Sequence, residues 1–105
     1  MNLSDRRSLE VALAVARALD GDPDRVLATG LQNIARWQRG SGRHPHLQAW
    51  EAIIRQGPEA VRQTLTGLDD RSRQLRSSSP FAGILSEDVR LYAIERASQN
   101  AERPS

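Results

Sequence analysis

The sequence predicts an all-α protein, a compact bundle of five or six short helices in a single domain. Apolar residues recur at helical spacing in six segments, and helix-capping residues stand between those segments. No segment shows the sustained alternation of apolar and polar residues that a half-buried strand requires. The length of 105 residues suits one domain. We expect residues 1–98 to form this domain and residues 99–105 to be a flexible polar tail.

The first predicted helix is apolar over almost its whole circumference. It begins at an N-cap of Ser4 or Asp5 and ends near Leu19, close to the helix-breaking sequence "DGDP". Four residues widen its apolar face beyond a single stripe: Val11, Ala14, Val15 and Ala18. A helix of this kind is either central in a bundle or one half of a homodimer interface, and the sequence leaves both arrangements open.

The second predicted helix starts at Pro23, with Asp22 as its N-cap, and runs to about Arg39. Gly30 lies inside this helix, where it costs about 1 kcal/mol relative to alanine, and we interpret it as a point of close packing. The residues of this helix that are expected to face inward are Leu27, Leu31, Ile34 and Trp37.

Four shorter helices are predicted after the loop "RGSGRHP" at residues 39–45. The third ends at the sequence "QGP" and the fourth starts at Pro58. Asp69 or Asp70 caps the fifth helix, and Ser86 caps the sixth. The side chains expected to face inward are, in chain order, Leu47, Trp50, Ile53, Ile54, Val61, Leu65, Leu68, Leu75, Val89, Tyr92 and either Ala93 or Ile94.

The connection between the last two helices contains the only phenylalanine of the chain, Phe81. Ser79 precedes a proline, which disfavours helical geometry there, and Gly83 can adopt a positive φ. Phe81 either anchors the connection in the core, where burial of the ring is worth roughly 1.5–3 kcal/mol, or it is held ready for a partner. We favour the packing role. The alternative is a partner-binding loop made of Ser78, Ser79, Pro80, Phe81 and Gly83.

Two stretches of the second half, "WEAIIRQGPEAVRQTLTG" and "SRQLRSSSPFAGILS", carry a specific pattern. It consists of a Trp-led helix, a "GP" step, a loop of the form LRxSSPFAG(I/V)L and a closing amphipathic helix. From Trp50 to Ile94 the chain therefore resembles a group of small bacterial antitoxin-like helical proteins. The resemblance implies the antitoxin side of a toxin–antitoxin pair and assigns no catalytic residues. The closing helix, "SEDVRLYAIERA", departs from the Pro-Glu-Glu-Arg-like opening of that group.

Arginine supplies all 15 of the Lys and Arg residues, and the middle of the chain is its basic part. Residues 36–79 hold eight arginines and four acids, a net charge of +4, whereas the flanking segments are each −1. A basic helix face can lie on phosphates, so a regulator that binds DNA or RNA is the alternative function. No helix-turn-helix pattern supports it. The candidate nucleic-acid contacts are Arg25, Arg36, Arg39, Arg43, Arg71, Arg73 and Arg76.

Catalysis is the least favoured function. Arg39 and His44 have the Arg-x-x-x-x-His spacing of the helical HEPN ribonucleases, but here the pair lies on a Gly-rich loop that would not fix its geometry. His44 and His46 have no third metal ligand nearby, and residues 77–79 are serines without a base in reach. The sequence therefore predicts no catalytic residue, no metal site and no cofactor.

The sequence favours a non-enzymatic protein-binding module. A small helical domain with an apolar first helix and an aromatic loop is suited to meet another protein or a second copy of itself. We expect a partner protein, in the terms of the resemblance a toxin, whose active site the domain occludes. The chain has no cysteine and no signal-peptide layout, so we expect a cytoplasmic protein without disulfides, thiolate metal sites or membrane contact.

Overall fold

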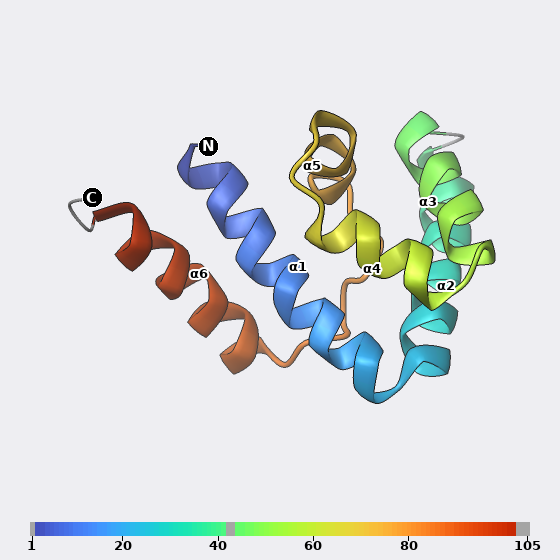
Figure 1. Cartoon of the computed structure of the whole chain (residues 1–105). Coiled ribbons are helices and arrows are strands. Elements are labelled where there is room, and N and C mark those ends of the chain that lie inside the picture. The colour runs from blue at the N-terminus through green and yellow to red at the C-terminus, as the bar shows by residue number, and fades with distance from the viewer. Residues whose placement is uncertain (1, 42–43, 103–105) are drawn as a thin grey trace.

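The computed structural model describes residues 2–41 and 44–102, and in this part of the chain it is an all-α bundle without strands, as the sequence predicts (Figure 1). Six helices succeed one another in these residues. They are α1 (Leu3–Gly21), α2 (Pro23–Ser41), α3 (Pro45–Arg55), α4 (Pro58–Thr66), α5 (Asp70–Arg76) and α6 (Glu87–Glu102). None of the helices that the structure describes has both the length and the apolar stretch needed to cross a membrane.

Helix α1 is the central element of the bundle. It packs against α2, α4, α5 and α6, with α6 alongside it at one edge of the molecule (Figure 1). These neighbours cover the wide apolar face that also suggested a homodimer, so that face alone no longer argues for self-association. The residues of α1 that are buried are Ala12, Ala14, Val15, Ala16 and Leu19.

Most helix boundaries follow from local capping. Asp22 accepts the amide proton of Arg25 at 3.3 Å, and Asp69 accepts that of Ser72 at 3.2 Å, as caps of α2 and α5. The predicted cap of α1 is wrong. Asn2 Oδ1 accepts the amide proton of Asp5 at 2.8 Å, so the helix starts before the expected Ser4 or Asp5.

The far end of the chain also differs from the predicted boundary. Helix α6 continues through Glu102, so residues 99–102 of the expected tail are helical. The remaining residues of that tail, 103–105, lie outside the described residues.

Trp50 is at the centre of the core and is fully buried. Its Nε1 donates a hydrogen bond to the carbonyl of Leu75 at 2.8 Å, which satisfies the only polar atom of the ring. Phe81 meets Trp50 edge to face, with ring centroids 5.3 Å apart and an interplanar angle of 87°. A Cβ on Gly30 would lie 2.8 Å from Phe81 Cε1 and 2.9 Å from Ile54 Cδ1. The close packing predicted at Gly30 is therefore confirmed, because only a glycine admits both side chains.

Three of the predicted core residues are exposed. Leu68 follows the end of α4 and is 71% exposed, while Val89 and Tyr92 on α6 are 45% and 61% exposed. Ala93 is buried, which confirms one of the two alternatives predicted there, and Ala97 faces inward in place of Val89 and Tyr92. The physical reason is the small size of these alanines, since they let α6 approach the alanine-rich α1 more closely than a tyrosine would.

Candidate functional site

The α5–α6 connection, residues 77–86, is packed into the body of the protein by Phe81. The ring of Phe81 is 4% exposed, and the neighbouring Pro80 and Ile84 are also buried. Gly83 adopts a φ of 88°, the left-handed conformation that was expected there. The packing role of Phe81 is therefore confirmed. Of the predicted partner-binding loop, Ser78 and Ser79 are half-buried and only Gly83 is exposed.

The connection is clamped from α2 by a residue that sequence reasoning missed. The Nδ2 group of Asn33 donates to the carbonyls of Pro80 at 2.8 Å and Ala82 at 2.9 Å. Its Oδ1 accepts from Arg36 at 2.9 Å, so every polar atom of this buried amide is satisfied. Arg25 adds a longer contact to the carbonyl of Ile84, at 3.5 Å. The only signal in the sequence is a polar residue on the otherwise apolar face that Gly30, Ile34 and Trp37 form.

Arg76 was expected to be a surface residue, and this is wrong. It is 4% exposed, and its Nη1 donates to the carbonyls of Gly67, Thr64 (3.3 Å) and Leu65 (3.4 Å) at the end of α4. A buried guanidinium at the C-terminus of a helix satisfies carbonyls that have no partner within that helix and neutralises the negative end of its dipole. Arg76 therefore does not belong to an exposed basic face.

The other candidate nucleic-acid contacts fall into two groups. Arg25, Arg36 and Arg39 are exposed on α2, and two of them contact the α5–α6 connection or its clamp as described above. Arg71 is exposed on α5, whereas Arg73 on the same helix pairs with Asp70. Arg43 lies outside the described residues. Of the seven arginines predicted to contact nucleic acid, the structure shows four exposed: Arg25, Arg36, Arg39 and Arg71.

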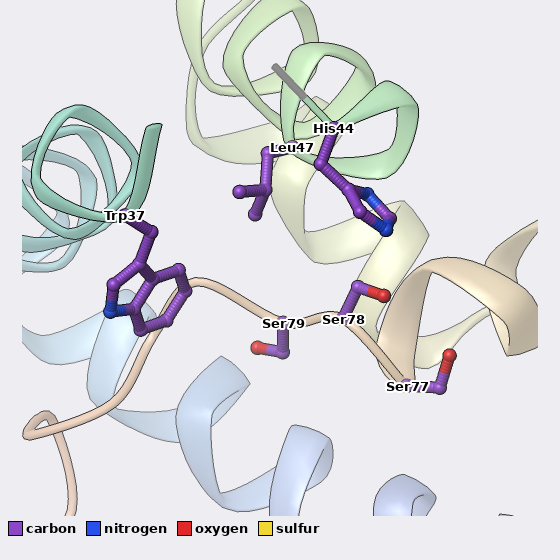
Figure 2. Close-up of a pocket in the computed structure, with 6 residues that line it drawn as sticks. All are labelled: Trp37, His44, Leu47, Ser77, Ser78 and Ser79. Atoms are coloured by element: carbon purple, nitrogen blue, oxygen red, sulfur yellow. The ribbon is translucent and has the colours of Figure 1, made fainter. Parts of the chain in front are cut away.

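A cleft opens where α2, the start of α3 and the α5–α6 connection meet (Figure 2). We call it the Trp37 cleft; its volume is about 310 Å³. Trp37 was expected in the core, but it is only half-buried because its ring forms a wall of this cleft. Figure 2 shows Trp37 on one side and His44 on the other. The lining residues are Trp37, His44, Leu47, Ser77, Ser78 and Ser79.

Three of the polar side chains that line the Trp37 cleft are held in place by hydrogen bonds. Ser78 Oγ lies 3.1 Å from Nδ1 of His46, and Ser77 Oγ donates to the carbonyl of Gln74 at 2.6 Å. His44 caps α3, because its Nδ1 accepts the amide proton of His46 at 3.2 Å. Leu47 and His44 at the start of α3 therefore face the indole of Trp37 across the cleft, with the serines of the α5–α6 connection between them (Figure 2).

The geometry adds no support to the catalytic hypotheses. Arg39 is exposed in the last turn of α2, and the Nδ1 atom of His44 is used as a helix cap. No contact between these two side chains occurs among the described residues that would fix them on a shared phosphate. In that same part of the chain no three His, Cys, Asp or Glu side chains are grouped so as to hold a metal ion.

Neither the known protein families, nor the curated proteins, nor the solved structures contain a match to this sequence or fold.

Proposed function

We propose that the protein is a non-catalytic protein-binding module and that the Trp37 cleft receives an apolar side chain of the partner. The observation that carries this proposal is the half-buried indole of Trp37 facing Leu47 across an open cleft rimmed by fixed hydroxyls. Tryptophans in such positions are frequent anchors of protein interfaces, because they combine a large apolar area with few rotamers to freeze.

The size of the cleft is sufficient for a side chain of a partner protein. Its volume of about 310 Å³ is at the lower end of the 300–1,000 Å³ that is typical of small-molecule sites. One aromatic side chain, which needs a space of about 150 Å³, fits in the cleft with room for neighbouring atoms of the partner, and the hydroxyls of Ser77 and Ser79 can bond to the partner's backbone. Because residues 36–79 carry a net charge of +4, the partner is expected to surround its apolar anchor with acidic residues.

The partner class follows from the resemblance of residues 50–94 to antitoxin-like proteins. In that interpretation the partner is a cytoplasmic toxin, and the domain inhibits it by covering its active site. Toxin and antitoxin are commonly encoded side by side, so the product of the adjacent gene is the partner to test.

Trp37→Ala is expected to weaken binding to that product by about 30-fold, the equivalent of a 2 kcal/mol interface hot spot. The variant should fold, because Trp37 is only half-buried. Titration calorimetry measures the affinity, and a thermal melt confirms the fold. Tyr92→Ala removes an aromatic ring that is 61% exposed on α6 and serves as the matched control. If the two variants bind equally well, the Trp37 cleft is not the interface.

Nucleic-acid binding is the second candidate, favoured by the exposure of Arg25, Arg36 and Arg39 together on α2. If this face binds DNA or RNA, affinity falls steeply with salt. The double variant Arg36→Ala, Arg39→Ala should then flatten the plot of log affinity against log salt by about one unit per lost phosphate contact. A lack of retention of the wild type on a nucleic-acid column at low salt would exclude this candidate.

A further inference from the structure

A second cavity, of about 490 Å³, lies where α1 and α6 meet the end of α5. We call it the arginine cavity, because three arginines line it: Arg7 from α1, Arg76 from α5 and Arg90 from α6. Serine hydroxyls from α1 and from the α5–α6 connection stand beside them. The full lining consists of Arg7, Ser8, Val11, Ala12, Val15, Arg76, Ser77, Ser79, Arg90 and Ile94.

The charge of the arginine cavity is poorly compensated. Its lining contains three guanidinium groups and no carboxylate. The ion pairs that the described residues form do not include Arg7 or Arg76, and Arg90 meets Glu87 only at 4.0 Å and on the exposed surface. Such a concentration of like charge is unfavourable in an empty cavity and favourable when an anion enters it.

Arg76 adds a buried positive charge to the wall of this cavity. Its Nη1 is used by the carbonyls at the end of α4, but its Nε and Nη2 are buried without a hydrogen-bond partner among the described residues. Buried donors of this kind are rare, and arginine cannot relieve the cost by losing its proton. Burial lowers the pKa of Arg76, and the carboxylates of Asp69 and Asp5 act in the opposite direction from outside the cavity.

The apolar side of the cavity continues into a smaller one of about 200 Å³. The two share Val11, Val15, Ser79 and Arg90, and the smaller one extends along Phe81 and Leu85. A ligand that places a charged group among the arginines can therefore place an apolar substituent against these side chains. The combination describes an amphipathic anion.

We propose that the arginine cavity binds a small phosphate monoester with an apolar substituent. Arg7 and Arg90 contact the phosphate oxygens together with the hydroxyls of Ser8 and Ser79, and Arg76 provides fixed positive charge in the wall. A phosphate dianion matches three guanidinium groups better than a single carboxylate does, and arginine recognises phosphate oxygens in a bidentate manner. The proposal is independent of partner binding at the Trp37 cleft, although Ser77 and Ser79 line both cavities.

Phenyl phosphate is the probe, with inorganic phosphate and phenylacetate as comparisons at matched ionic strength in sodium chloride. Phenyl phosphate is expected to raise the melting temperature by about 5–10 °C at a tenfold excess over its Kd. Calorimetry should show that it binds more tightly than either comparison ligand. Inorganic phosphate of equal affinity would overturn the apolar part of the proposal, and phenylacetate of equal affinity would overturn the choice of phosphate.

The decisive comparison uses two double variants with the same change in net charge. Arg7→Gln with Arg90→Gln should weaken phenyl phosphate binding by about tenfold or more, because it removes two charge-assisted contacts. Arg17→Gln with Arg96→Gln alters exposed arginines of the same two helices outside the cavity and should bind like the wild type. Phosphate also stabilises proteins in general because it is excluded from their surface. That effect is the same for both double variants, so only a difference between them shows binding in the cavity. If both double variants lose the same affinity for phenyl phosphate, the effect comes from net charge alone and the proposed site is wrong.

Discussion

Replacement of Phe81 by alanine is expected to lower the free energy of unfolding by about 3–5 kcal/mol. The ring is 4% exposed, it meets Trp50 edge to face, and Gly30 is kept free of a side chain so that it can approach α2. The substitution loses the transfer free energy of the ring and leaves a cavity in the core. A domain of this size has a total stability of about 5–10 kcal/mol, so the variant should be partly unfolded or melt far below the wild type. Urea denaturation followed by circular dichroism measures the change.

Two further variants separate the ring from the rest of the α5–α6 connection. Asn33→Ala leaves the ring in place and removes the amide that holds the carbonyls of Pro80 and Ala82, at an expected cost of about 1–3 kcal/mol. Ala82→Ser changes an exposed side chain next to Phe81 and should stay within about 0.5 kcal/mol of the wild type. An unchanged unfolding midpoint for Phe81→Ala would mean that the ring is not part of the core and that it is available to a partner.

Arg76→Ala is expected to cost about 1.5–3 kcal/mol, the range of hydrogen bonds made by a charged donor. The substitution leaves the carbonyls of Gly67, Thr64 and Leu65 without their buried partner and removes the positive charge at the end of α4. Judged from the sequence, the same change would have stayed within about 0.5 kcal/mol, as for a surface residue. The difference between these two values comes entirely from the burial of Arg76.

Arg73→Ala is the matched control for Arg76. Arg73 lies one turn earlier on α5 and pairs with the exposed Asp70, an interaction that is worth about 0–1 kcal/mol at the surface. Thermal and urea unfolding of both variants should place Arg76→Ala well below Arg73→Ala. Equal stabilities would contradict the anchoring role of Arg76 at the junction of α4 and α5.

The features that the sequence predicts well are those with local causes. The starts of α2 and α5 depend on Asp22 and Asp69, which accept amide protons of the first turn. The start of α4 depends on Pro58, whose fixed φ suits the first helical position and whose missing N–H would have no partner there. The close packing at Gly30 was also visible, because glycine inside a helix needs a reason. These signals need no knowledge of what lies across the core.

The features that the sequence does not predict depend on distant parts of the chain. Helix α6 offers apolar residues on several sides, and the choice of Ala97 over Tyr92 is made by the fit against α1. Asn33 and Arg76 are buried only because carbonyls in other segments accept their protons. The Trp37 cleft likewise combines α2, α3 and the α5–α6 connection, and no single stretch of sequence contains it.

The central claim, that a partner's side chain enters the Trp37 cleft, is tested most directly by the fluorescence of Trp37 during complex formation. Trp50 is fully buried, so its emission should not change when a complex forms. Trp37 is half-buried, and its indole loses contact with water when the cleft is filled. Addition of the adjacent gene's product is expected to shift the emission to shorter wavelength in the wild type and to leave the emission of Trp37→Phe unchanged. A complex that forms without any change in Trp37 emission would contradict the account and place the interface elsewhere on the protein.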